Sequence, residues 1–112
     1  MKLWIDDVRP APEGYVWCRS VNDTRFYIEG LDYAKNEMES AHLPTDCCPT
    51  IDLIDIDHDA GDYAVDGGDY IKLLDWFEET GRSYPIHIHS MNPVGAENMR
   101  RIIRRNGWVE IR

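Results

Sequence analysis

The stretch IDLIDID, residues 51–57, decides the fold class of this sequence. Its aliphatic residues are typical of a buried β-strand, and the polar run HDAG at residues 58–61 marks the end of that strand. The segments on either side, residues 21–38 and 69–80, have the periodicity of amphipathic helices. A strand between two helices is typical of a parallel sheet with helical crossovers. The sequence therefore predicts an α/β fold.

The two helices have recognisable ends and apolar positions. Ser20 fits the N-cap of the first helix, with Asp23 three residues later. The apolar positions expected on this helix are Phe26, Leu31, Tyr33 and Met38. Gly81 ends the second helix, whose apolar face is expected to contain Tyr70, Leu73, Leu74 and Phe77. Between the strand and this helix, residues 61–68 are expected to form a flexible loop.

The remaining segments complete one predicted domain over residues 1–112. Strands are expected at residues 2–5, 15–19, 84–89 and 108–111, and a third helix from Pro93 to Asn106, ended by Gly107. This order predicts a mostly parallel five-stranded sheet with strand order 2-1-3-4-5. Right-handed crossovers then place the three helices on one face. The loop over residues 8–14 is short for a crossover, so the direction of the second strand stays open.

One face of this sheet is expected to lack helices. In residues 86–89 the isoleucines point to one face and His87 and His89 to the other. Because parallel sheets are normally covered on both faces, we expect a second copy of the chain to cover the helix-poor face in a homodimer.

Composition limits the classes of partner. With 43% hydrophobic and 29% charged residues the chain is globular in type, and its net charge of −9 argues against long nucleic acids and anionic membranes as partners. Residues 52–69 contain seven aspartates and no lysine or arginine, a density that a bound cation would relieve. From its acidic residues, the stretch MKLWIDD is not expected to be a signal peptide, and the three cysteines have no metal-ligand spacing. We expect a cytoplasmic protein with reduced thiols.

Polar residues follow three strands that are neighbours in the predicted order. They are Asp6 and Asp7 after the first strand, Asp57, His58 and Asp59 after the third, and His89, Ser90 and Asn92 after the fourth. Since ligands of open parallel sheets bind outside the carboxyl ends of the strands, this convergence predicts one site. His87, Asp62, Asp66 and Asp69 are interpreted as structural or solvated.

The residue types at this edge indicate metal-assisted phosphate chemistry. Asp6, Asp7, Asp57 and Asp59 are candidate ligands for a divalent cation. Mg²⁺ is the first expectation because it prefers carboxylates, and Mn²⁺ or Zn²⁺ compete because imidazoles are near. His58 and His89 are candidate general acids or bases, and Asp57 is a candidate nucleophile. Arg9, Ser90 and Asn92, with the amides that begin the third helix, are expected to position a phosphate.

The pattern of an acidic pair, a later aspartate and a later serine resembles the receiver domain of response regulators. The resemblance implies a receiver or flavodoxin-like fold in which Asp6, Asp7 and Asp57 hold Mg²⁺, Asp57 accepts a phosphoryl group and Ser90 is the hydroxyl residue. The sequence departs from ordinary receivers by replacing the first helix with the loop VRPAPEG, by lacking a lysine near the last strand, and by lacking a final helix.

Three blocks resemble more closely a divergent family of cyclic-phosphate-processing receiver domains. They are LWIDDVRP at residues 3–10, IDHDAG at 56–61 and HSMNPVG at 89–95. The resemblance implies metal-dependent processing or hydrolysis of a phosphoester, such as a cyclic phosphate or a cyclic nucleotide. A non-catalytic module that binds a nucleotide or a protein, and a true phospho-acceptor, remain alternatives.

Overall fold

The computed structural model describes residues 1–112 and contains a four-stranded parallel sheet. The strands are β1 (Lys2–Ile5), β2 (Tyr15–Cys18), β3 (Leu53–Ile56) and β4 (Ile86–Ile88), in the order β2-β1-β3-β4. The helices are α1 (Val21–Ser40), α2 (Ile71–Glu79) and α3 (Pro93–Asn106), with a short 3₁₀ helix, η1, at Gly61–Val65. The direction of β2, which the sequence left open, is parallel to β1.

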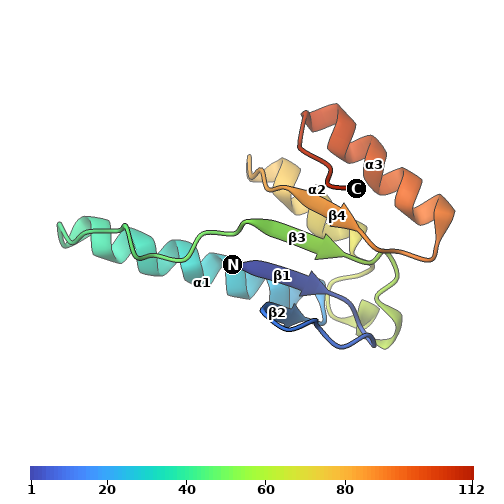
Figure 1. Ribbon diagram of the computed structural model, residues 1–112, viewed down its shortest axis with the longest axis horizontal. Helices are drawn as coiled ribbons and strands as arrows, with labels where there is room; N and C mark the ends of the chain where they lie inside the picture. Colours follow the sequence, from blue (N-terminus) through green and yellow to red (C-terminus); the bar gives the residue numbers. More distant parts are fainter.

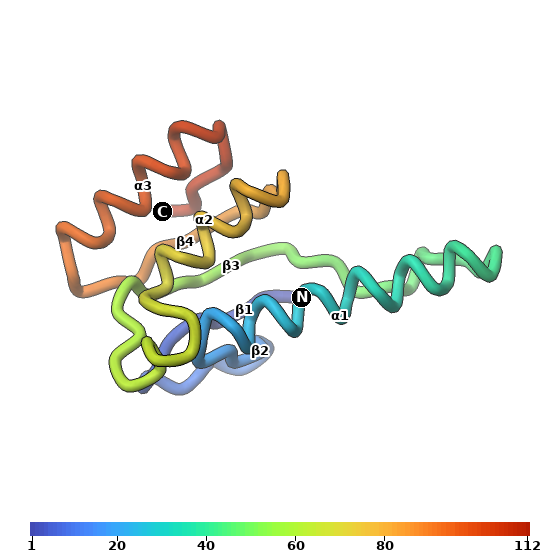
Figure 2. Tube along the Cα trace, turned by 180° about the vertical axis from the view of Figure 1, so that it is seen from behind, coloured from blue at the N-terminus to red at the C-terminus, as the bar shows by residue number.

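The three helices cover one face of the sheet, as right-handed crossovers require. α1 and α2 lie behind the sheet in Figure 1 and in front of it in Figure 2, and α2 packs between α1 and α3. The core between these layers contains fully buried isoleucines and leucines from the strands together with Tyr70, Leu73, Leu74 and Phe77 from the second helical segment. The predicted receiver or flavodoxin-like α/β fold is confirmed.

The predicted fifth strand is reduced to a single bridge. Ile86 pairs with Glu110 in parallel, through hydrogen bonds that join Ile86 to Val109 and Ile111. The prediction of a strand over residues 108–111 was wrong in extent. β4 has only three residues, so it offers the chain end little to pair with. The carbonyl of Ile111 is also contacted by the ring of His87, with 2.9 Å between Nδ1 and O.

Helix α1 differs from prediction in the face that it buries. Ser20 is its N-cap, as predicted, and accepts a hydrogen bond from the amide of Asp23. The buried residues are Val21, Thr24 and Ile28, whereas two of the expected apolar positions face solvent: Phe26 is 82% exposed and Tyr33 67%. The outer half of the helix projects beyond the sheet beside the segment that returns to β3 (Figures 1 and 2). There is no sheet under this half to bury an apolar face.

The segment predicted as a flexible loop, residues 61–68, contains η1 and is tied to neighbouring elements. Asp66 accepts hydrogen bonds from Ser20 and Asn22, and Asp69 accepts one from the amide of Ala60. These contacts support the structural interpretation of both aspartates. They also delay the start of α2 to Ile71, two residues later than predicted. None of the helices combines the length and hydropathy needed to cross a bilayer.

The helix-poor face of the sheet is partly covered by the chain itself. On this face Trp4 stacks on His89, with ring centroids 3.9 Å apart, and its indole donates to the carbonyl of Arg9 in the loop after β1. Trp17 stays 36% exposed, and the alternation of β3 places half-buried Leu53 on the same face. The uncovered surface around Trp17 and Leu53, called the strip below, is where we still predict the contact of a homodimer.

If a second copy covers this strip, Leu53→Glu will weaken the dimer because it buries a charge in the contact. Sedimentation velocity should then find a dimer for the unchanged protein and a monomer for the variant. Phe26→Glu, which places the same charge on the opposite side of the molecule, should remain dimeric. A monomer for the unchanged protein across its accessible concentration range contradicts the prediction.

Candidate functional site

The parallel register brings the ends of β1, β3 and β4 to one edge of the sheet. Ile5, Ile56 and Ile88 are paired across the three strands. The next residues continue the ladder: the amide of Asp57 donates to the carbonyl of Ile5, and the amide of His89 to the carbonyl of Ile56. Asp6, Asp57 and His89 therefore follow neighbouring strand ends, as the sequence predicted.

Three of the four predicted metal ligands form one cluster. Carboxylate oxygens of Asp6, Asp7 and Asp57 lie within 4.8 Å of one another. Asp6 is fully buried and Asp57 is nearly so. Burial alone would raise the pKa of Asp6, but the amides of Arg9 and Val8 and the His89 side chain donate hydrogen bonds to its carboxylate. These bonds outweigh burial and lower the pKa, so Asp6 is held as an anion.

Asp7 carries the uncompensated charge of this cluster. Its pKa is raised, first by burial and then by the negative charges of Asp6 and Asp57. Its carboxylate also packs against the backbone of Gly61, where φ is +55° and a Cβ would overlap the Asp7 oxygen. Like charges held this closely favour a bound cation. A hard divalent ion held by carboxylates therefore fits the donor set of Asp6, Asp7 and Asp57.

His89 is enclosed by two carboxylates. Its Nδ1 lies 2.6 Å from Asp55 and its Nε2 lies 2.9 Å from Asp6, and only 10% of its side chain is exposed. Burial lowers the pKa of the ring, but the hydrogen bonds and charges of Asp55 and Asp6 outweigh it, so the pKa is raised. With both ring nitrogens donating, His89 is held as an imidazolium. It can give a proton and has no free lone pair to take one.

Asp59, the fourth predicted ligand, belongs to a separate group. Its carboxylate lies 2.7 Å from Nδ1 of His58 and 3.2 Å from the side-chain nitrogen of Asn92. The hydrogen bond with His58 is the main cause of its lowered pKa. The structure groups Asp59 with His58 and Asp69, not with the other three predicted ligands. Asp59 is thus placed to orient the imidazole of His58, whose Nε2 has no hydrogen-bond partner.

The ring of His58 is packed against the start of α3. A Cβ at Gly95 would overlap three atoms of the imidazole, so only glycine lets the ring and the helix approach this closely. The amide of Gly95 donates to the side chain of Asn92, which is the N-cap of α3. The helix start, the ring of His58 and the carboxylate of Asp59 thus form one connected unit.

The three predicted phosphate-binding residues all have structural partners. The hydroxyl oxygen of Ser90 accepts from the amide of Asn92, and the Asn92 side chain both caps α3 and donates to Asp59. Arg9 is exposed and donates to the carbonyl of His89. Capping uses the amide of Gly95, one of the helix amides expected to bind phosphate. Arg9 and the hydroxyl proton of Ser90 keep the most freedom to contact a ligand.

Two residues of this edge were not predicted from the sequence. Asp55 lies within β3, and no role in the site was predicted for it, yet its side chain is buried, with the residue 6% exposed, and pairs with His89. Arg19 donates twice to the carbonyl of Asp7 and stacks on Trp17 and Tyr63. An aspartate inside an otherwise aliphatic strand was the available signal for Asp55, because a buried carboxylate requires a partner.

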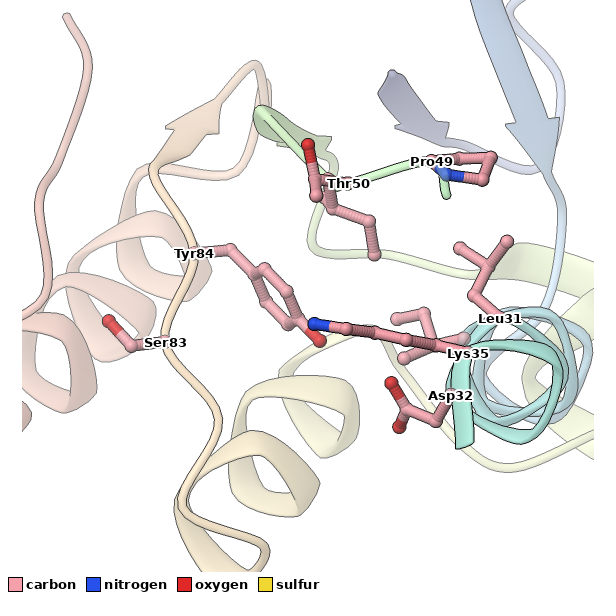
Figure 3. A pocket seen from close by; sticks show the side chains of 9 residues that line it. Leu31, Asp32, Lys35, Pro49, Thr50, Ser83 and Tyr84 are labelled. Atoms are coloured by element: carbon pink, nitrogen blue, oxygen red, sulfur yellow. The ribbon is translucent and has the colours of Figure 1, made fainter. Parts of the chain in front are cut away.

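The edge of the sheet that carries Asp6, Asp7 and Asp57, called the carboxylate edge below, is not part of an enclosed cavity. The cavities in the structure are lined by other residues, and one of about 250 Å³ lies beside α1, before the start of β3 and β4 (Figure 3). The edge is an open site where a ligand would reach the carboxylates from solvent.

The environment of His89 predicts how stability depends on pH in metal-free protein. Its pKa is raised in the folded state, so the folded form binds the proton more tightly than the unfolded chain. This stabilisation is present below the ordinary value of 6.5 and is lost as pH rises through the raised pKa. In EDTA, urea denaturation should show the free energy of unfolding falling by up to about 1.4 kcal/mol per pH unit in that window. His89→Gln should remove this slope, and an equal slope in the variant contradicts the assignment.

Two glycine substitutions in helices should have opposite effects. Gly95→Ala places a methyl group against the ring of His58 and should destabilise the fold by about 1–3 kcal/mol. Gly30→Ala, in α1, meets no atom within 4 Å and should stabilise it by up to about 1 kcal/mol. Chemical denaturation measures both changes. A Gly95→Ala protein as stable as the unchanged chain would contradict the close packing of His58.

Comparison with known proteins places the chain in a family. No curated protein and no solved structure matches the chain. The sequence profile of the family described as Cyclic-phosphate processing Receiver domain matches residues 1–105. This match includes all three blocks around the strand ends and every element of the sheet. The chain therefore belongs to the cyclic-phosphate processing receiver domain family.

Proposed function

We propose that this protein is a metal-dependent phosphoesterase that opens a small cyclic phosphate, such as a cyclic nucleotide. The observation that carries the proposal is the cluster of Asp6, Asp7 and Asp57, whose charges are brought within 4.8 Å at the end of a parallel sheet. The description of the family names cyclic-phosphate processing. The net charge of −9 favours a small substrate over a long polynucleotide.

The reaction is hydrolysis of one of the two ester bonds of a cyclic phosphodiester. The oxygen of water forms a bond to phosphorus, the bond from phosphorus to one ring oxygen breaks, and the product is a phosphomonoester. A divalent cation on Asp6, Asp7 and Asp57 would neutralise the charge of the phosphate. One proton must leave the attacking water and one must reach the departing oxygen.

His58 and His89 suit different halves of this proton transfer. His58 has Nδ1 held by Asp59 and Nε2 without a partner, which is the arrangement of an oriented general base. His89 is held as an imidazolium between Asp55 and Asp6, which suits donation of a proton to the leaving oxygen. Arg9 is exposed beside His89 and offers the guanidinium that would orient the phosphate.

A second function, ligand binding without turnover, is favoured by two observations. The hydrogen bonds of Asp6 and His89 satisfy most of their polar atoms within the chain, and the edge lacks an enclosed cavity to exclude water. A receiver-like module that captures a nucleotide or a protein at this edge would need no proton transfer. A third candidate function is that of a phospho-acceptor, in which Asp57 itself is phosphorylated.

The experiment is a screen of cyclic nucleotides and generic phosphodiesters with Mg²⁺, Mn²⁺ or Zn²⁺ after removal of metal by EDTA. We expect turnover that needs metal and falls by at least about 100-fold in Asp57→Asn and in His58→Gln. The matched control is Asp62→Asn, because Asp62 is an exposed aspartate of η1 and its substitution should leave activity unchanged.

The outcomes distinguish the three functions. Thermal stabilisation by a cyclic nucleotide without turnover would favour the binding module. Labelling of Asp57 by acetyl phosphate, without turnover, would favour a phospho-acceptor. If the protein shows no turnover of any substrate and no stabilisation by any metal, the enzymatic proposal is rejected.

A further inference from the structure

A cavity of about 250 Å³ lies at the edge of the sheet opposite the carboxylates. Its walls come from three segments: α1, residues 49–51 before β3, and residues 83–84 before β4. These segments precede the strands, whereas Asp57 and His89 follow them. The cavity is therefore separate from the candidate active site. A cavity of about 150 Å³ is enough to admit benzene, so this one has room for a ring with a short polar substituent.

Part of the cavity lining is apolar, and this part is called the floor below. Ile28 and Leu31 from α1 and Ile51 from the segment before β3 contribute aliphatic surface, and the ring of Tyr84 forms the facing wall. Figure 3 shows Tyr84 and Lys35 reaching toward one another from opposite sides of the cavity. A ligand here would bury an apolar body against the floor and place a polar group near these two side chains.

The electrostatics of the cavity favour an anion. Asp32, the only acidic residue of the lining, is paired with Arg82 at 2.7 Å. Arg82 also donates to the hydroxyl of Tyr84 and stacks on Trp76. Lys35 has neither an ion pair nor a hydrogen bond. The cavity thus presents an unpaired cation in a protein whose net charge is −9.

The hydroxyl of Tyr84 is a second hydrogen-bond donor for a ligand, beside the ammonium of Lys35. It accepts a hydrogen bond from Arg82, and its own proton has no acceptor within the chain. A carboxylate could therefore accept from the ammonium of Lys35 and from this phenol while its apolar body covers the floor. Charge-assisted hydrogen bonds of this kind are the stronger class.

We infer that the cavity beside Lys35 binds a small organic monoanion, a carboxylate that carries an apolar ring or branched chain. This site is separate from the carboxylate edge and does not take part in the proposed hydrolysis.

The test is a titration of metal-free, ¹⁵N-labelled protein with phenylacetate, followed by amide chemical shifts. We expect saturable shifts at Ile28, Leu31 and Ile51 with a Kd on the order of 1 mM, as for a ligand of this size. Phenylacetamide, which has the same ring without the charge, should bind at least about tenfold more weakly.

Variants separate the ion pair from general attraction to the surface. Lys35→Gln should weaken phenylacetate binding by about tenfold and leave phenylacetamide unchanged. Lys72→Gln, which removes an exposed lysine of α2 that does not line the cavity, should change neither. Equal binding of the two ligands, equal loss in both variants, or no saturable shift at the cavity residues would overturn the inference. Because no metal or phosphate is present, none of these results bears on turnover at the carboxylate edge.

Discussion

The crowding of negative charge at one end of a parallel sheet is the constraint on which the rest of this structure depends. The register that pairs Ile5 with Ile56 forces the carboxylates of Asp6 and Asp57 together at the next residue. The hydrogen-bond donors at this edge are the backbone amides after β1, the ring of His89, which follows β4, and the side chain of Arg19, which donates to the carbonyl of Asp7. These contacts come from three different segments, so the charge cluster also joins the loops to the sheet.

These donors stabilise the negative charge of some carboxylates more than that of others, so the acidities of the groups at this edge differ. Asp6 is satisfied by three hydrogen bonds and keeps a low pKa, whereas burial and the neighbouring anions raise the pKa of Asp7. Burial is the main cause that raises the pKa of Tyr70, and the negative charges of this cluster raise it further. The hydroxyl of Tyr70 donates to the backbone carbonyl of Arg19. The two histidines differ in a similar way: both nitrogens of His89 are engaged, and only one nitrogen of His58.

The convergence of strand ends could be predicted because it follows from topology. Once residues 2–5, 51–57 and 84–89 are recognised as neighbouring parallel strands, Asp6, Asp57 and His89 must share an edge. The partners of each side chain could not be predicted. Asp59 follows the same strand as Asp57, yet its carboxylate pairs with His58, and only the backbone path after β3 decides between these groupings. Tyr33 was placed in the wrong environment because helical periodicity does not show how far a helix extends beyond its sheet. Phe26 lies in the inner half of α1, on the side away from the buried Thr24 and Ile28, so for this residue the wrong face of the helix was chosen.

The projecting half of α1 divides the molecule into parts of unequal cooperativity. All three buried residues of this helix lie in its first half, and beyond Leu31 only Met38 is even half-buried. The outer turns are therefore held by helix propensity and by the returning segment, without support from the core. Their amides can exchange with solvent through local opening that leaves the sheet folded. Lys35 lies on these outer turns, so the cavity wall that it forms belongs to the least cooperative part of the chain.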